Sequence, residues 1–213
     1  MSSAMQFYEP AKGHPFKHDP FKSIIAPRPI GWISSRSANG VDNLAPYSFF
    51  NAFAGEPPII GFSSAGWKDS VQNIQETGEF CWNMTTKSLA EQMNLSSAPI
   101  ASGQSEFELA GLTVAESKLV RAPRVAESPV SFECRLTQLI RLNNAEQVAT
   151  DYWLVLGEVV GVYIAQDLLE DGMFQMLKAE PILRAGGPST YFSLSQETQF
   201  EMFRPTLESV ERS

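Results

Sequence analysis

The stretch that decides the fold runs from Arg28 to Asn83 and reads RPIGWISSRSANGVDNLAPYSFFNAFAGEPPIIGFSSAGWKDSVQNIQETGEFCWN. Its pattern predicts, in order, a strand over Pro29–Ser37, a turn at Ala38–Gly40, a loop over Asn43–Ser48, a strand that closes on Ser63–Ser64 and a helix over Ser70–Thr77. This order indicates a site for a phosphate at the start of the helix and for a flat ring beside the loop.

The phosphate end follows from the local chemistry of the helix start. Lys68 or Asp69 stands where an N-cap belongs, so the first turn is expected to present free N–H groups. Together with the Lys68 ammonium and the hydroxyls of Ser63, Ser64 and Ser70, these donors predict a site for a dianion. The helix end alone contributes about 0.3–1 kcal/mol when exposed and up to about 2 kcal/mol when partly buried, so the other donors must add to it.

An alternative stays open for this segment. Taken alone, Lys68-Asp69-Ser70 reads more readily as an ordinary helix start with solvated charges. The preceding Ser63-Ser64 and the specialised segment Ala45–Ser48 favour the ligand site.

Further segments recur in a characteristic succession from Arg28 to Tyr191. They are RPI at 28–30, WISS at 32–35, NLAPYSFFN at 43–51, EPPIIGFS at 56–63, KDSVQNI at 68–74, GEF at 78–80, GEVV at 157–160 and LRAGG at 183–187. Each is weak alone, but in this order they resemble the flavin reductase-like family, which includes NAD(P)H:flavin oxidoreductases and flavoredoxins. The resemblance implies a mainly β fold, an FMN-binding split β-barrel with a few short peripheral helices.

The resemblance also implies a set of cofactor-binding residues. Ala45, Pro46, Tyr47 and Ser48 are expected along the edge and face of the isoalloxazine ring, and Ser34 or Ser35 with Ser63, Lys68, Asp69 and Ser70 around the ribityl phosphate. Trp32 and Asn51 complete the set. Because side chains alternate along a strand, we expect only one of the two neighbouring serines of the first strand to point at the ligand. Phe49 and Phe50 are expected in the core, and Trp67 either shields the phosphate or lies at the surface.

The implied activity is that of an oxidoreductase that passes electrons from NAD(P)H, as substrate, through FMN to free flavin or a partner acceptor. The cofactor carries the hydride chemistry, so we expect no catalytic side chain; backbone N–H groups of Ala45–Ser48 would stabilise charge on the reduced ring. Two alternatives stay open. One is a flavoredoxin-like electron-transfer protein without direct nicotinamide use, and the other is a non-catalytic flavin-binding module.

One departure from the family pattern concerns the electron donor. Many reductases that this chain resembles carry a histidine, associated with nicotinamide access, where Tyr163 stands. Tyrosine can hydrogen-bond or stack but carries no positive charge near neutral pH. Arg36 and Arg184 offer other cations, which can equally be ion-pair partners. The choice between NADH, NADPH and a protein donor therefore stays open.

Composition narrows the class of protein. The 213 residues with 43% hydrophobic content fit one domain, with residues 1–20 as an N-terminal arm, 21–192 as the barrel core and 193–213 as a C-terminal extension. The net charge of −8, from 16 basic and 24 acidic residues, argues against nucleic-acid and anionic-membrane partners. With no apolar run long enough to span a bilayer and no signal-like start, we expect a cytoplasmic protein. Cys81 and Cys134 lie in apolar strand patterns and are expected to be buried.

The remaining chain favours a barrel over a layered α/β fold, because strands predominate and no Gly-x-Gly-x-x-Gly unit occurs. Val130–Thr137 alternates apolar and polar residues, which predicts a half-buried strand with Ser131 and Glu133 on the solvent side. Tyr152–Ile164 predicts a longer strand, with an apolar face that includes Val162 and with bends at Gly157 and Gly161. Helices are predicted over Lys87–Leu95, with a Ser88…Glu91 capping box, and over Glu106–Leu109; loops are predicted over Pro99–Gln104 and Ala122–Pro129.

Two further expectations concern metal binding and assembly. His14 and His18 stand four residues apart, but Pro15 and Pro20 oppose a helix there, so we expect no metal site. On family grounds a homodimer is expected, with Tyr191 or the segment Phe192–Pro205 reaching across the interface, and a protein redox partner is a further expectation.

Overall fold

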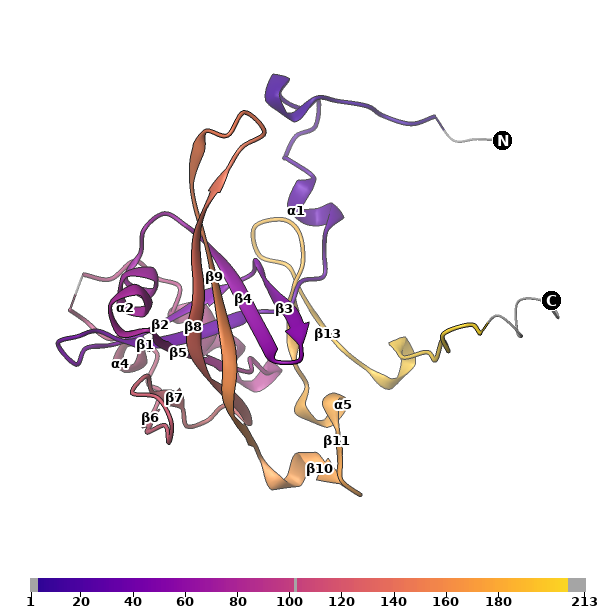
Figure 1. Cartoon of the computed structure of the whole chain (residues 1–213). Helices are drawn as coiled ribbons and strands as arrows, with labels where there is room; N and C mark the ends of the chain where they lie inside the picture. Colours follow the sequence, from indigo (N-terminus) through magenta and orange to yellow (C-terminus); the bar gives the residue numbers. More distant parts are fainter. Residues whose placement is uncertain (1–3, 102, 207–213) are drawn as a thin grey trace.

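The computed structural model describes residues 4–101 and 103–206, and it is built around a seven-stranded antiparallel sheet (Figure 1). The spatial order is β2-β1-β5-β8-β9-β4-β3. The strands are β1 (Gly31–Arg36), β2 (Asp42–Tyr47), β3 (Phe50–Gly55), β4 (Pro58–Ala65), β5 (Glu79–Asn83), β8 (Val130–Asn143) and β9 (Ala149–Ile164). The fold is mainly β, as predicted.

The two outermost strands of this sheet are neighbours in the sequence. Strands β2 and β3 lie at opposite ends of the spatial order, yet only Ser48 and Phe49 separate them. The sheet must therefore curl until its two ends meet. At that point the Ser63 N–H of β4 donates to the Phe49 carbonyl at 2.8 Å.

Shorter elements surround the sheet. The helices are α1 (Phe21–Ile24), α2 (Asp69–Thr77), α3 (Ala90–Leu95), α4 (Glu106–Leu109) and α5 (Met176–Ala179), with 3₁₀ turns η1 (Pro10–Lys12), η2 (Lys87–Leu89), η3 (Gln166–Leu168) and η4 (Gln196–Thr198). The small strands pair as β6 (Val114–Ala115) with β7 (Arg124–Val125), β10 (Leu169–Glu170) with β11 (Met173–Phe174), and β12 (Ile182–Arg184) with β13 (Tyr191–Ser193).

Helix α2 confirms the helix predicted from Ser70 to Thr77 and begins one residue earlier. Val71 and Ile74 lie one turn apart and are fully buried in the main core, which anchors the helix on the sheet. The helix ends at Gly78, whose φ of +73° is a left-handed conformation that glycine adopts without steric cost.

Strand β1 separates two apolar clusters. Ile33 points into the main cluster with Tyr47 and Phe62, whereas Trp32 points into a second cluster that includes residues of α3 and α4. Five of its six residues are buried, so the strand is covered on both faces. Cys81 and Cys134 are fully buried free thiols, as predicted.

Several local predictions were wrong. The predicted loop over Asn43–Ser48 is mostly strand β2, which pairs with β1 over six residues; Pro46 is tolerated because β2 is an outer strand of the sheet. Strand β3 was not predicted. The Ser88…Glu91 capping box does not form, because Ser88 Oγ pairs with Thr86 Oγ1 at 2.8 Å and the predicted helix divides into η2 and α3. The predicted loop over Ala122–Pro129 contains the short strand β7.

Strands β8 and β9 differ from the alternation expected of them. Ser131 and Glu133 are fully buried, because the segment between β6 and β7 covers that face of β8. Val162 is 56% exposed, because the ladder shifts register beside Gly161 and changes which residues face the core. A second shift lies beside Gly157, where the extra residue is Thr137 of β8, so a register irregularity lies beside each of the two predicted positions.

The two terminal segments lie at the surface of the molecule. Residues 4–25 are almost entirely exposed, and residues 194–206 run away from the sheet (Figure 1). The division into an arm, a core and an extension stays a prediction, and residues 1–3 of the arm and 207–213 of the extension lie outside the described residues. No helix in residues 4–101 and 103–206 is long and apolar enough to cross a membrane, and no three potential metal ligands gather there.

Candidate functional site

A cleft of about 500 Å³ opens between β2, β4 and the start of α2. Its volume falls within the range of about 300–1,000 Å³ that is usual for small-molecule sites. The predicted residues that line it are Ala45, Pro46, Tyr47, Ser48, Ser63, Lys68, Asp69 and Ser70. Most of the predicted set therefore lies together around one cavity, although the residues come from three elements.

One end of the cleft is the N-terminus of α2. Lys68 occupies the N-cap position in an extended conformation, and no side chain caps the helix. The first N–H groups of a helix have no partner within it, so those of Asp69, Ser70 and Val71 depend on groups outside it. With the Lys68 side chain in the cleft wall, this end offers donors and positive potential to an anion.

Ser63 carries a polar group that the protein leaves unpaired. Its hydroxyl oxygen is buried in the cleft wall and has no hydrogen-bond partner among the described residues. A buried, unsatisfied polar atom costs about 1–3 kcal/mol. A ligand oxygen in the cleft would satisfy it.

The other predicted serines already have partners. Ser70 Oγ donates to Asn43 Oδ1 at 2.8 Å, and Asn43 Nδ2 donates to Glu106 Oε2 at 2.9 Å. Ser64 Oγ donates to the Gly66 carbonyl at 2.9 Å. These hydroxyl protons are directed into the protein, so Ser70 faces a ligand mainly through its backbone N–H.

Besides Ser64, four predicted residues do not line this cleft. Trp32 is fully buried and its Nε1 donates to Ser96 Oγ at 2.9 Å. Ser34 donates to the Pro123 carbonyl on one side of β1, and Ser35 donates to Asn43 Oδ1 at 3.3 Å on the other, so the expected alternation is present. Asn51 lines a smaller neighbouring cleft.

Several residues of the cleft were missed by sequence analysis. They are Lys22, Asn43, Phe49, Ala65, Glu106, Tyr152 and the segment 96–100. Asn43 begins the NLAPYS segment and could have been included. The others carry no local signal, because they reach the cleft only through the tertiary fold. Phe49, expected in the core, is half-buried in the cleft wall, whereas Phe50 stacks on Trp82 with ring centroids 5.8 Å apart.

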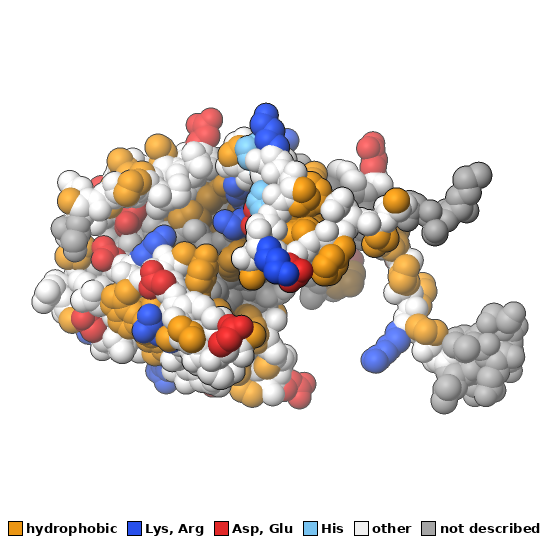
Figure 2. Space-filling view, turned by 90° about the horizontal axis from the view of Figure 1, so that it is seen from above, with side chains coloured by type: hydrophobic (Ala, Val, Ile, Leu, Met, Phe, Trp, Pro, Cys, Tyr) orange, Lys and Arg blue, Asp and Glu red, His pale blue; other side chains and the backbone are white. Residues whose placement is uncertain are grey.

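Part of the cleft wall is aromatic. Tyr47 packs on Phe62 with ring centroids 4.4 Å apart, and burial raises the pKa of the Tyr47 hydroxyl. A second cleft of about 310 Å³ adjoins the main cleft and shares Ser48, Phe49 and Ser63 with it. Seen from above, the molecule is hollowed beside the N-terminal segment, and Lys and Arg side chains lie at the edge of the hollow (Figure 2).

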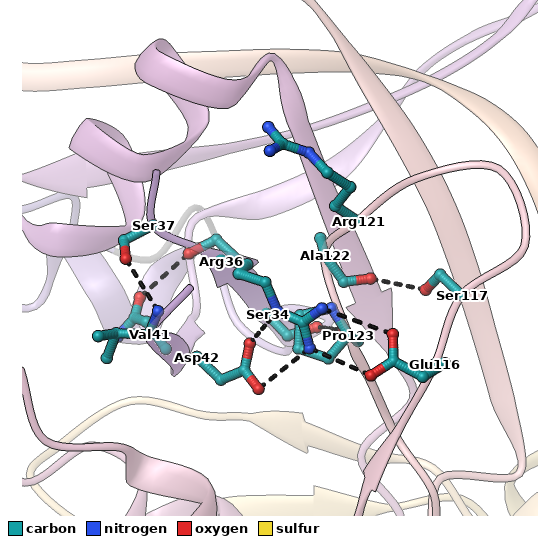
Figure 3. Close-up of polar contacts among 12 residues, drawn as sticks. Ser34, Arg36, Ser37, Val41, Asp42, Glu116, Ser117, Arg121, Ala122 and Pro123 are labelled. Atoms are coloured by element: carbon teal, nitrogen blue, oxygen red, sulfur yellow. Dashed lines mark hydrogen bonds and ion pairs between the residues drawn. The ribbon is translucent and has the colours of Figure 1, made fainter. Parts of the chain in front are cut away.

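Arg36 and Arg184, considered above as free cations, are engaged elsewhere. Arg36 lies between Asp42 and Glu116, with Nε 2.6 Å from Asp42 Oδ1, and the hydrogen bond to Asp42 raises its pKa (Figure 3). Arg184 donates to the carbonyls of Gly187, Pro188 and Thr190. Neither lines the main cleft.

Tyr163 is also engaged in a structural contact. Its hydroxyl donates to Glu133 Oε1 at 2.5 Å, and the Arg124 guanidinium lies 3.6 Å from its ring centroid. Tyr163 does not line the main cleft. Trp67 is 41% exposed and packs edge-on against Trp153 outside the cleft.

Comparison with known proteins gives consistent matches. The model of the flavin reductase-like domain matches residues 24–182. Nitrilotriacetate monooxygenase component B from Bacillus cereus is 35% identical, with a TM-score of 0.84 over 94% of this chain and 100% of that chain. An uncharacterized protein of Aquifex aeolicus is 36% identical over 170 residues, which cover 77% of this chain and 83% of that protein.

The fold itself recurs at lower identity. A Shewanella frigidimarina protein described as having a split barrel domain is 24% identical, with a TM-score of 0.76 over 86% of this chain and 90% of that chain. The expected split β-barrel is thus confirmed. The chain belongs to the flavin reductase-like family.

Proposed function

We propose that the chain binds FMN in the main cleft and uses it to transfer electrons from NAD(P)H to free flavin or to a partner acceptor. The observation that carries the proposal is that the unpaired Ser63 hydroxyl and the uncapped start of α2 line one cleft. Family membership supports flavin as the ligand. The Bacillus cereus relative is one component of a monooxygenase, which supports a partner acceptor.

At the phosphate end, Lys68 and the N–H groups at the start of α2 would hold the ribityl phosphate. The chain carries a net charge of −8, so attraction of a dianion has to come from local groups. Asp69 lines the cleft, but its carboxylate has the same sign of charge as phosphate. Its proposed contribution is therefore its backbone N–H, with the carboxylate stabilising the positive end of the helix.

At the ring end, Ala45, Pro46, Tyr47 and Ser48 would lie against the isoalloxazine ring. When bound, FMN supplies hydride acceptance and onward electron transfer. The chain supplies position: Tyr47 is held by Phe62, and the wall around Ser48 is fixed where β2 meets β3. Pro46 has no N–H, so backbone donors for the ring can come only from its neighbours.

A second candidate is an electron-transfer flavoprotein that uses no nicotinamide directly. The positions of Arg36, Arg184 and Tyr163 favour it, because all three are engaged in contacts outside the main cleft. In this case another protein would reduce the bound flavin.

The test begins with the apoprotein. FMN, FAD and riboflavin are titrated by fluorescence quenching, and NADH or NADPH is then added to the FMN complex without oxygen. We expect FMN to bind more tightly than riboflavin, and one of the nicotinamides to bleach the flavin absorbance within turnover times.

Each result separates the candidates. Tight FMN binding with no bleaching by either nicotinamide would favour the electron-transfer protein and contradict the reductase. A protein that binds FMN but is reduced by no donor would be a flavin-binding module. Absence of flavin binding would reject all three.

A further inference from the structure

Arg28 is a buried cation for which the proposed function gives no role. The residue is only 8% exposed, yet no Asp or Glu in the described part of the chain forms an ion pair with it. Burial lowers the pKa of the Arg28 guanidinium, and Arg184 nearby adds to the shift. Arginine nevertheless stays protonated, so the site holds a buried charge without a countercharge. A buried charge without an opposite charge beside it raises the free energy of the folded protein, so a bound group that carries negative charge would lower that cost.

The Arg28 guanidinium is held by carbonyl groups from three segments. Nε donates to the Ser48 carbonyl at 3.1 Å, Nη1 to the Lys22 carbonyl at 2.5 Å and Nη2 to the Ala185 carbonyl at 3.4 Å. Carbonyl dipoles satisfy the donors but carry no formal charge. The side chain therefore ties α1, the β2–β3 junction and the chain after β12 together, and its charge stays uncompensated.

These contacts place Arg28 directly behind the ring end of the main cleft. Lys22 and Ser48, whose carbonyls it binds, both line that cleft. Arg28 itself lines the adjoining cleft, and its guanidinium carbon lies 5.8 Å from the Phe49 ring centroid. Phe49 lines both clefts, so the Arg28 charge lies beside a residue of the wall of the main cleft.

We propose that Arg28 is the positioning residue of the ring end and that its charge favours the reduced form of the flavin. The first effect is geometric, because the planar guanidinium group binds the carbonyls of Lys22 and Ser48 and so fixes both residues in the wall of the main cleft. The second is electrostatic: two-electron reduction places negative charge on the ring, and a nearby cation of low solvent exposure stabilises that charge. The proposal rests on flavin binding in the main cleft.

The experiment separates charge from geometry with three variants. Arg28→Met removes the charge and the hydrogen bonds of the guanidinium group. Arg28→Lys keeps the charge but not the guanidinium geometry, and Arg184→Met is the matched control. Arg184 also binds three carbonyls and is paired with Arg28 across a β-bridge, but it lines neither cleft. Each apoprotein is titrated without oxygen with oxidised and with dithionite-reduced FMN and riboflavin.

We expect Arg28→Met to bind oxidised FMN and oxidised riboflavin about tenfold more weakly, the scale of one charge-assisted hydrogen bond. Its preference for reduced over oxidised flavin should fall by about a further tenfold, which corresponds to about 30 mV in the two-electron potential of the bound flavin. Arg28→Lys should weaken both flavins but keep that preference. Arg184→Met should change neither quantity.

The ratio of reduced to oxidised affinity is the decisive readout, because a purely structural role would not change it. An unchanged ratio in Arg28→Met, or a loss confined to FMN, would overturn the proposal. If Arg28→Met does not fold, Arg28→Gln, which keeps amide N–H donors without the charge, carries the test, because its ratio of reduced to oxidised affinity must still fall. A wild-type protein that binds no flavin would instead reject the proposed function, and this inference with it.

Discussion

The serine side chains around the cleft differ in whether their hydroxyl groups donate a hydrogen bond within the protein. Ser70 and Ser64 donate to Asn43 and to the Gly66 carbonyl, whereas the Ser63 hydroxyl has no partner in the described structure. At the scale of single residues, this difference separates groups that stabilise the fold from groups left free for a ligand. Lys68 belongs with Ser63, because it lines the cleft without an ion-pair partner among the described residues.

Replacing Lys68 should identify the phosphate end. Lys68→Ala is expected to weaken FMN binding by about 1.5–3 kcal/mol, the range of a charge-assisted hydrogen bond, and to leave riboflavin binding nearly unchanged. Fluorescence titration of both ligands measures the difference. Lys12→Ala, which removes an exposed lysine that is paired with Glu9 and does not line the cleft, is the control. Equal losses for FMN and riboflavin would remove Lys68 from the phosphate site.

Ser63 and Ser64 form a matched pair for the same site. Ser63→Ala removes an unsatisfied group, so the apoprotein should be no less stable, while FMN binding weakens by about 0.5–1.5 kcal/mol. Ser64→Ala removes a formed hydrogen bond and should lower the stability by a similar amount without changing FMN binding. Urea unfolding and FMN titration of both variants measure these effects. The reverse pattern would show that Ser63 has no ligand role.

At the scale of elements, the segment between β6 and β7 covers one face of β8. Glu133 joins them: it is fully buried and accepts hydrogen bonds from the Lys118 N–H at 2.7 Å, the Leu119 N–H at 2.6 Å and the Tyr163 hydroxyl. Burial alone would raise the pKa of the Glu133 carboxyl. These hydrogen bonds and the charge of Arg124 outweigh burial and lower the pKa below its ordinary value of 4.5.

This carboxylate should make stability depend on pH in one direction. Because the pKa is lower in the folded protein, the contribution is fully present above about pH 4.5 and is lost as the pH falls through the folded-state pKa. Glu133→Gln should therefore lower the free energy of unfolding by about 1–3 kcal/mol at pH 7. Urea unfolding of both proteins from pH 7 to pH 3 should show that the difference between their free energies of unfolding becomes smaller below pH 4.5. If this difference does not depend on pH, the lower stability of the variant is due to packing.

At the scale of the whole molecule, large apolar side chains are exposed on both terminal segments and on β3. Phe200 and Phe203 are 77% and 85% exposed, Ile24 is 70% exposed and Phe53 is 54% exposed. Apolar side chains that gather in a large exposed patch mark interaction sites, and we propose that these side chains gather in this way. It supports the proposed homodimer, in which the segment Phe192–Pro205 would cover part of a second copy.

The dimer can be tested through this segment. Sedimentation of the purified protein should give twice the 23.5 kDa mass of the chain, and Phe200→Glu combined with Phe203→Glu should shift it toward the monomer. Val148→Glu, which alters an apolar residue that is 60% exposed and lies outside the terminal segments, is the control and should leave the dimer intact. A monomeric wild type that binds FMN would contradict the dimer and leave the flavin site in place.

Features of the fold that depend on residues close together in the sequence could be predicted, whereas those that depend on the whole sheet could not. Helix α2 and its end at Gly78 could be predicted because helix signals lie within a few residues of one another. The bends at Gly157 and Gly161 were predicted for the same reason. Strand β2 was read as a loop, because the presence of Pro46 argues against a strand unless the strand is known to lie at the end of a sheet.

The sequence by itself determined the family, the mainly β fold and the segments that meet around the cleft, because these depend on local patterns and on their order along the chain. The tertiary structure alone decided which side chains are available there. Ser70 is engaged because Asn43, 27 residues away, accepts its proton, and Lys22 and Tyr152 reach the cleft from distant segments. Hydrogen-bond partners and cavity walls are set by proximity in space, which local sequence patterns do not record.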